Sequence, residues 1–233
     1  MNRKDSEYTS FISQEQIINN DFDLSVRRYV LGDGSKNIKQ LENTQPLESL
    51  VDLIRAQLLK QDKDVTDGDE FFEVGARDIG SNGIVMQPTK SMILSGRMRD
   101  RANLQQIQPG DIILSTKGAI GKVAIVGDDC GINWVVNQTF QVLRLKSPQV
   151  ISPDYLYMYL TSQLIQSYLA EQASGAGIQV LKTGDVRNLP IQVLQAKQQQ
   201  EITDTRHAIL NDYEKINTLQ KQITKLNRNF WSY

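Results

Sequence analysis

Arginine stands at every second position of one short segment, at Arg97, Arg99 and Arg101. On an extended chain, alternate side chains project to the same side. Three guanidinium groups on one side suit contacts to phosphates, or paired hydrogen bonds to guanine in a DNA major groove. If the segment is extended, it presents a side suited to DNA contacts, and surface solubility is the alternative for each single arginine.

Other side chains could take part in the same chemistry. Residues 90–122 carry six basic and two acidic side chains, although the whole chain has 26 basic and 27 acidic residues. A balanced total can hide one basic face, but charge alone is equally compatible with ordinary solvated loops. The further DNA-contact candidates are three cations and two amides of the kind that pair with adenine: Lys90, Lys117, Lys122, Gln138 and Gln179.

The sequence offers little for catalysis. It contains neither the G-x-G-x-x-G pattern after a strand nor the G-x-x-x-x-G-K-[ST] pattern of nucleotide-binding loops. The single histidine, His207, falls on the polar side of a terminal helix, and the single cysteine, Cys130, lies among acidic residues that raise the pKa of a thiol. We therefore expect no enzyme activity and no cofactor or metal on this chain.

Acidic residues gather between residues 61 and 73, where a nuclease metal site is one interpretation. The spacing does not match the calcium loop of an EF-hand, which needs glycine and glutamate at fixed positions. A nuclease core also places a lysine beside its acids on a strand, and the pattern predicts no strand here. A solvated acidic loop is therefore favoured for Asp62, Asp64, Asp67, Asp69, Glu70 and Glu73.

The elements that must position these groups divide the chain into three zones. Residues 1–45 are polar and predict one short helix after Ser13, a good N-cap, and a turn or linker over residues 32–37. Residues 46–195 have the composition of a globular domain, and residues 196–233 contain neither glycine nor proline. We expect a linker-like extension, a folded domain and a long helix.

The segment 46–59 opens the domain, and the near-helical spacing of Leu47, Leu50, Val51 and Ile54 predicts a helix there. A second helix is expected over residues 152–169, capped by Ser152 with Pro153 at its first position.

Strands are expected at 111–115 and 122–126, on either side of a glycine turn, and one longer strand at 134–145. Two short strands around a turn complete the domain at 177–194. The expected fold class is α+β, with mostly antiparallel strands.

The terminal zone repeats a large apolar residue at a spacing of seven, which is a heptad pattern. An exposed seam of this kind must be covered, and no other segment of the chain is long enough to cover it. We favour an intermolecular coiled coil over internal packing. Its interface would consist of Ile202, Ile209, Ile216, Leu219, Ile223, Leu226 and Phe230.

The compartment follows from what the sequence lacks. One cysteine excludes an intramolecular disulfide framework. No apolar run approaches the roughly 18 residues of a membrane span, and the N-terminus lacks the apolar core of a signal peptide. We expect a soluble, cytoplasmic protein without a membrane partner.

Four stretches together resemble the target recognition domain of type I restriction-modification specificity subunits. They are residues 110–126, 135–145, 152–169 and 177–191. In order, they give two strands around a small-residue turn, an N-Q-x-F-like strand, a Tyr- and Leu-rich helix, and a glycine-containing run that ends in L-P-I. The heptad helix resembles the family's spacer helix, so the resemblance covers about residues 46–230.

The resemblance implies a non-catalytic subunit that reads double-stranded DNA and directs N6-adenine methylation. The partner methyltransferase would bind S-adenosylmethionine, and a restriction and motor subunit would join for DNA cleavage. Family members usually carry two recognition domains and two spacer helices, whereas this chain has one of each. It therefore resembles a half-subunit, which a homodimer through the terminal helix would complete to read an inverted repeat.

The N-terminal run at residues 16–30 resembles the tail of the methyltransferase subunits of the same systems, without their catalytic N-P-P-[YF] motif. Three interpretations remain open. The chain is a fragment of a fused methyltransferase–specificity protein, it keeps a remnant of such a fusion, or this run docks on a separate methyltransferase. The alternative for the whole chain is a coiled-coil assembly adaptor that does not touch DNA.

Overall fold

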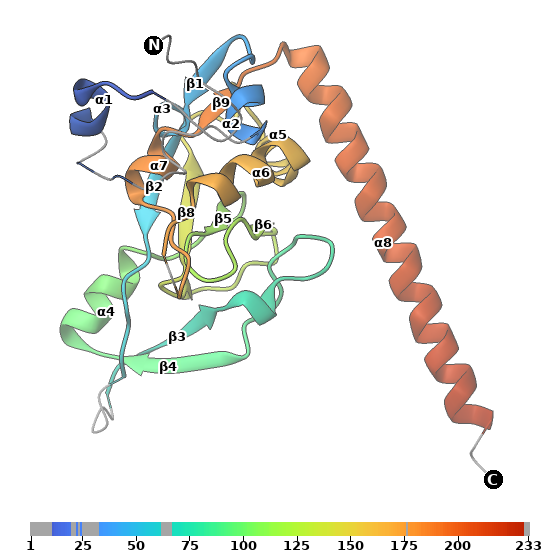
Figure 1. Cartoon of the computed structure of the whole chain (residues 1–233). Helices are drawn as coiled ribbons and strands as arrows, with labels where there is room; N and C mark the ends of the chain where they lie inside the picture. The colour runs from blue at the N-terminus through green and yellow to red at the C-terminus, as the bar shows by residue number, and fades with distance from the viewer. Residues whose placement is uncertain are drawn as a thin grey trace.

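A body of strands and short helices carries one long C-terminal helix in the computed structural model, which describes residues 11–19, 22, 24, 33–61, 67–175 and 177–230 (Figure 1). The helices are α1 Gln14–Asn19, α2 Asp33–Ile38, α3 Leu47–Leu50, α4 Gly96–Asn103, α5 Pro153–Thr161, α6 Gln163–Gln172, α7 Thr183–Arg187 and α8 Ala196–Phe230, with a 3₁₀ turn η2 at Ala76–Asp78. The strands are β1 Thr44–Pro46, β2 Val51–Arg55, β3 Asp69–Val74, β4 Lys90–Leu94, β5 Ile112–Ser115, β6 Val123–Ile125, β7 Trp134–Val136, β8 Phe140–Leu145 and β9 Pro190–Gln192. In this described part of the chain, no helix has both the length and the apolar character needed to cross a membrane.

Within the described residues, the strands form sheets of four, three and two strands. The four-stranded sheet has the antiparallel order β2-β8-β5-β6, with Ile112 level with both Leu143 and Ile125. The three-stranded sheet has the order β4-β3-β7, in which β3 runs antiparallel to β4 and parallel to β7. Strands β1 and β9 pair antiparallel. The predicted α+β class with mostly antiparallel strands is confirmed.

Strand β5 forms the centre of the body, because all four of its residues are buried. Alternate residues of a strand point to opposite faces of its sheet. Ile112 and Leu114 accordingly pack with Leu156 of α5 and its neighbours, whereas Ile113 packs with Val136 of β7 in a second cluster. Helices therefore cover one face of the four-stranded sheet and the three-stranded sheet covers the other.

Locally encoded elements are where the sequence predicted them. Ser13 precedes α1, where its Oγ accepts the backbone N–H of Gln16 at 3.2 Å and Gln16 Oε1 accepts the backbone N–H of Ser13 at 2.7 Å. This reciprocal pair is a capping box. Ser152 caps α5 with Pro153 in the first turn, and β5 and β6 form the predicted hairpin around the glycine turn.

The predicted helix in the segment 46–59 is largely wrong. Only Leu47–Leu50 is helical, and strand β2 follows it. Each of the five residues of β2 is level with a residue of β8, from Val51 opposite Leu145 to Arg55 opposite Gln141. The partner strand lies far along the chain, so the spacing of apolar residues within the segment could not reveal the pairing.

The predicted turn or linker at residues 32–37 is instead helix α2. A distant carboxylate satisfies its first amides, because Gly34 N–H donates to Glu171 Oε1 at 2.8 Å and Ser35 N–H donates to Glu171 Oε2 at 2.9 Å. A negative charge at a helix N-terminus is stabilising. Helix α2 lies against α6, so part of the zone before residue 46 packs on the body.

Two further predicted elements are interrupted. The strand predicted at 134–145 becomes β7 and β8, which belong to different sheets, because Asn137 Oδ1 accepts the backbone N–H of Thr139 at 2.9 Å and turns the chain. The helix predicted at 152–169 breaks at Ser162, which ends α5 and caps α6.

Of the two strands predicted at 177–194, β9 is present, while the first is reduced to isolated bridges at Val180 and is followed by α7.

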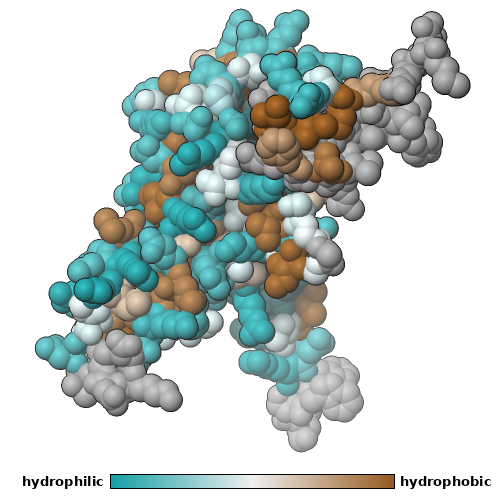
Figure 2. Space-filling model, turned by 60° about the vertical axis from the view of Figure 1, so that its left-hand side comes forward, coloured by the Kyte–Doolittle hydropathy of each residue, from teal (hydrophilic) through white to brown (hydrophobic). Residues whose placement is uncertain are grey.

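The predicted long helix is present as α8, which has two environments along its length. Its first turns pack on α5, and Ile202 joins the apolar cluster of the body. Its far end stands away from the body in Figure 1. Figure 2 shows the same separation from another side: the lower half of the molecule divides into two limbs with a hollow between them.

Candidate nucleic-acid interface

The three alternating arginines lie on helix α4, not on an extended segment. Gly96 opens the helix with a φ of 47°, a backbone conformation that favours glycine. On a helix, Arg97 and Arg101 share one face because they are four residues apart, while Arg99 points to another. Arg99 Nε lies 3.8 Å from Asp69 Oδ2. The expectation that all three guanidinium groups project from one side is therefore wrong, although all three side chains are exposed.

Two of the predicted DNA-binding lysines make polar contacts to other residues of the body. Lys90 Nζ forms an ion pair with Glu73, the residue level with it across the β3–β4 pair. Lys122 Nζ donates to the backbone carbonyl of Ala76 at 2.6 Å, which ties the β6 strand to η2. These lysines stay candidate phosphate ligands, but each already has a partner in the same chain.

Three other predicted residues are brought to the same end of the four-stranded sheet by backbone hydrogen bonds. Thr116 N–H donates to the carbonyl of Thr139 at 2.8 Å, which joins the β5–β6 turn to the β7–β8 turn. Gly118 N–H donates to the carbonyl of Gln179 at 2.9 Å, which joins the β5–β6 turn to the loop between α6 and α7. We call the side chains of these three loops the turn cluster, which consists of Lys117, Gln138 and Gln179.

The turn cluster combines exposed side chains with a fixed backbone. Gln138 and Gln179 are exposed, and Lys117 is half-buried. Gly121 has a φ of 83°, and a Cβ atom there would lie 2.6 Å from Gln166 Oε1. Gln166 Nε2 donates to the Gly121 carbonyl at 2.9 Å, so α6 holds the turn in place. Amide groups on such a support are suited to reading base edges in a groove.

An ion pair neutralises Asp111, one of the two acids of the basic segment 90–122. Asp111 is buried, and its carboxylate accepts hydrogen bonds from Arg144 Nε at 2.8 Å and Arg144 Nη2 at 2.7 Å. Those hydrogen bonds raise the pKa of the Arg144 guanidinium. Asp111 therefore does not offset the exposed cations of residues 90–122, because its charge is neutralised within the core.

The described residues hold no group of three or more His, Cys, Asp and Glu side chains that could bind a metal ion. Asp62 and Asp64 of the acidic run lie outside those residues. Burial, followed by the charges of Asp111 and Asp129, raises the pKa of the Cys130 thiol to about 11. A thiol with this pKa stays protonated at neutral pH and is a poor nucleophile.

Sequence reasoning missed Arg206, which fixes α8 to the body. Its side chain is 2% exposed. Arg206 Nη2 donates to the carbonyl of Asn82 at 2.6 Å, its guanidinium carbon lies 4.1 Å from the centre of the Tyr157 ring, and its Nε lies 3.8 Å from Asp154 Oδ1. No pattern marks this arginine, because its partners come from α5 and from the loop before β4.

His207 supports the same junction. Its Nε2 lies 3.3 Å from Asp154 Oδ2, next to the contact made by Arg206. One turn earlier, the Thr203 and Ser152 hydroxyls are 3.3 Å apart, and Gln199 Nε2 donates to the carbonyl of Val150 at 2.9 Å. The first turns of α8 therefore belong structurally to the body.

The heptad seam is mostly exposed in the single chain. Exposure rises along the helix, from 37% at Ile209 to 47% at Ile216, 57% at Leu219 and Ile223, and 68% at Leu226. Ile202 differs from these residues because it packs on the body, and the side chain of Phe230 lies outside the described part. Figure 1 shows that no other element accompanies the far half of α8 within the described residues.

Comparison with known proteins now adds to this geometry. A family model for the type I restriction modification DNA specificity domain matches residues 43–227, which is most of the chain. The chain belongs to this family. The match includes the three sheets, the turn cluster and nearly all of α8, whereas α1 and α2 precede it.

The relatives of this specificity domain are considerably longer. This chain is 27% identical to the Escherichia coli type I restriction enzyme EcoBI specificity subunit over 141 residues. These residues make up 60% of this chain and 28% of that protein. The specificity subunit of a type I restriction-modification system from M. genitalium has the same fold, with 19% identity and a TM-score of 0.55 over 82% of this chain and 45% of that one. A chain of another solved type I system aligns with 14% identity and a TM-score of 0.53, over 92% of this chain and 53% of that one. The specificity domain thus spans about half or less of each of these relatives.

Proposed function

We propose that this chain recognises a DNA sequence for a type I restriction-modification system. The observation that carries the proposal is the turn cluster, in which backbone hydrogen bonds join three loops that carry two exposed amides and a half-buried lysine. Amides that pair with adenine and a cation that meets phosphate supply both the specific and the non-specific part of DNA binding. Membership of the specificity-domain family supports this assignment.

The chain would act as a non-catalytic subunit in the cytoplasm. A partner N6-adenine methyltransferase would bind S-adenosylmethionine and carry out the methylation, and a restriction and motor subunit would cleave unmodified DNA. The family match and the likeness to chains of type I systems support these partners. The residues described in this chain supply recognition and assembly.

Homodimerisation through α8 would complete the recognition unit. Among the described residues, the seam from Ile209 to Leu226 is exposed, and the specificity domain spans less than half of the E. coli and M. genitalium specificity subunits. A second copy on this seam would place two turn clusters on one duplex. A two-fold dimer of this kind reads an inverted repeat.

The charges along α8 favour antiparallel pairing of the two helices. Residues 196–214 of α8 hold four acids, Glu201, Asp204, Asp212 and Glu214, with the cations Lys197 and Arg206, whereas residues 215–230 hold four cations, Lys215, Lys221, Lys225 and Arg228, and no acid. Parallel helices would place like charges level with each other. Antiparallel helices would bring the acidic stretch of each toward the basic stretch of the other, which is a long-range effect rather than a set of direct ion pairs, because Lys221, Lys225 and Arg228 lie off the seam.

The test of the proposal is selection of duplexes from a random pool by the purified full chain. We expect enrichment of a split inverted repeat. Replacement of Gln138 or Gln179 by Ala should relax one position of each half-site, with a cost of about 1–3 kcal/mol against the preferred base. Gln40→Ala is the matched control, because Gln40 is exposed and lies outside the turn cluster.

Two results would contradict the proposal. Unchanged base preference in both glutamine variants would exclude the turn cluster as the reading surface. Failure to enrich any duplex, together with retained binding to a methyltransferase subunit, would favour the adaptor interpretation.

A further inference from the structure

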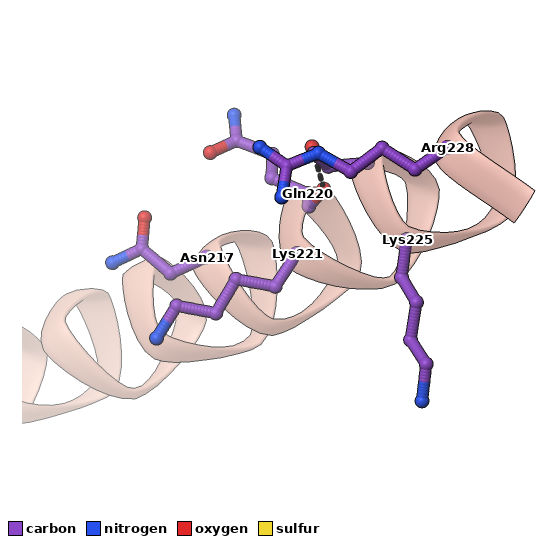
Figure 3. Close-up of a pocket in the computed structure, with 6 residues that line it drawn as sticks. Asn217, Gln220, Lys221, Lys225 and Arg228 are labelled. Atoms are coloured by element: carbon purple, nitrogen blue, oxygen red, sulfur yellow. Dashed lines mark hydrogen bonds between the residues drawn. The ribbon is translucent and has the colours of Figure 1, made fainter.

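The far half of α8 carries a second positive surface that the turn cluster does not include. No acidic residue follows Glu214 in the chain, while Lys215, Lys221, Lys225 and Arg228 do. Lys215 Nζ pairs with Asp212 Oδ1 at 2.9 Å. The other three cations line a shallow groove along the helix, which Figure 3 shows in close-up. We call this surface the arch face, formed by Asn217, Gln220, Lys221, Thr224, Lys225 and Arg228.

The arch face lies on the side of α8 that turns toward the body. An α-helix has about 3.6 residues per turn, so Thr224, five turns beyond Arg206, lies on the same line of the helix surface as that anchor. Arg206 points into the body, and the arch face therefore borders the open space between the free half of α8 and the body. By the same arithmetic, the heptad seam lies roughly 60–160° from Thr224 around the helix, in the direction opposite to the three cations, so a second copy on the seam leaves Lys221, Lys225 and Arg228 open.

The chemistry of the arch face suits a phosphate backbone better than a protein. Its side chains are three long cations, two amides and a hydroxyl, without an apolar residue among them. The Thr224 hydroxyl donates within the helix to the carbonyl of Gln220 at 2.9 Å (Figure 3). A protein interface usually has an apolar centre, whereas DNA backbone binding needs only cations and hydrogen-bond donors.

The opposite side of the open space carries positive charge as well. Turn η2 and the start of β4 lie at the end of the three-stranded sheet that is nearer to α8 (Figure 1). Arg77 on η2 is exposed. Lys90, at the start of β4, is already paired with Glu73, so Arg77 is the exposed cation that a polyanion between the two limbs would meet on this side.

We propose that the arch face binds the sugar–phosphate backbone of duplex DNA, at base pairs that the turn cluster does not read. The inference rests on the proposed function, because it concerns the same duplex. It assigns α8 a second role besides assembly, which is a sequence-independent contact to the DNA between the two half-sites.

The test compares two triple variants of the full chain that lose equal charge. K221Q/K225Q/R228Q removes the arch cations, and K39Q/K146Q/K197Q removes three exposed cations elsewhere. Fluorescence anisotropy measures binding to a labelled random-sequence duplex over a range of salt concentrations, and circular dichroism checks that both variants are folded. Each lost phosphate contact lowers the slope of log K against log salt by about 0.9.

We expect the arch variant to bind the random duplex at least about tenfold more weakly at low salt, with a slope lower by about 2–3, and to keep its selected sequence. The control variant should bind like the wild type. An arch variant whose affinity and slope equal those of the control variant would overturn the inference. If the wild-type chain still selects a specific sequence in that case, the proposed function is unaffected. A wild-type chain that binds no duplex would contradict both the inference and the proposed function. An arch variant that binds DNA normally but loses a methyltransferase subunit would show an acidic protein partner and also overturn the inference.

Discussion

At the scale of single residues, Arg206 joins the long helix α8 to the body. It is buried, yet it carries a full charge and bonds to a backbone carbonyl of a loop more than a hundred residues earlier. Buried charges persist only where they are paired and hydrogen-bonded. Arg206 meets this condition in part, because Nη2 donates to Asn82 and the guanidinium lies near Asp154 and Tyr157, whereas its buried Nε has no hydrogen-bond partner among the described residues.

Arg206→Met should destabilise the fold, because methionine fills the space but cannot donate to Asn82 or pair with Asp154. The expected loss in the free energy of unfolding is about 1.5–3 kcal/mol, the usual range for hydrogen bonds to charged groups. Urea denaturation followed by circular dichroism measures it. Lys197→Met, at an exposed position on the same helix, should change stability by less than about 0.5 kcal/mol. Equal stability of the two variants would contradict a structural role for Arg206.

Cys130 gives a prediction about pH. Because burial and two carboxylates raise the pKa of its thiol to about 11, alkylation by iodoacetamide in the folded protein should be slow at pH 7.5. The rate should increase as the pH approaches 11, and urea should restore the reactivity of an ordinary thiol. Fast alkylation of the folded protein at pH 7.5 would contradict the buried environment.

The same pKa shift predicts the direction of one stability change. The folded protein holds the thiol proton more tightly than the unfolded chain, whose cysteine has a pKa near 9. The stability from this group is therefore complete below pH 9 and is lost as the pH rises toward 11. Cys130→Ala should remove this part of the alkaline loss, which thermal melts across that interval would measure.

At the scale of elements, the sequence predicted what is encoded locally. The capping box before α1, the Ser152 cap, the β5–β6 hairpin and the long α8 all depend on residues close in sequence. Strand β2 and helix α2 depend on β8 and on Glu171, which lie far along the chain, and both were missed. A partner distant in sequence overrides a local pattern, and one sequence does not show which partner that is.

The candidate site follows the same rule. The glycine turn and the amide side chains are visible in the sequence, which predicts Lys117, Gln138 and Gln179 as DNA-contact residues. In the structure, backbone hydrogen bonds join the loops that carry them. The arginines were assigned to a common side on the assumption of an extended chain, and the helix that begins at Gly96 separates Arg99 from the other two. The heptad pattern predicts only the seam, and no sequence pattern predicts the cationic face on the side of α8 that borders the body.

The orientation of the α8 pair can be read from cysteine cross-links. In an antiparallel pair with Ile216 opposite Leu226, Leu219 lies opposite Ile223. A mixture of L219C and I223C chains, each also carrying C130S, should therefore form a disulfide under mild oxidation, while L219C alone should not. Non-reducing gel electrophoresis gives the readout. Efficient cross-linking of L219C with itself would show that the helices are parallel.

At the scale of the whole molecule, the boundary between body and assembly helix lies later than the start of α8. Residues 199–207 hold the anchoring contacts, so a chain ending at residue 210 keeps them. Light scattering should show a dimer for the full chain and a folded monomer for this truncation. A truncation at residue 195 removes Arg206 as well and should also lower the melting temperature. A full chain that stays monomeric at micromolar concentration would contradict homodimerisation.

The anchor at Arg206 also makes α8 a lever. From Arg206 to Arg228 the helix extends about 33 Å, at about 1.5 Å per residue. A tilt of about 10° at the anchored end would therefore move the far end by about 6 Å, which is nearly two base-pair steps of B-DNA. Small changes in the packing of Arg206 against Tyr157 and Asp154 would change the separation of two half-sites far more than changes along the helix itself. In the proposed dimer, the spacing between the two half-sites would thus depend more on the anchor at Arg206 than on the contact between the two helices.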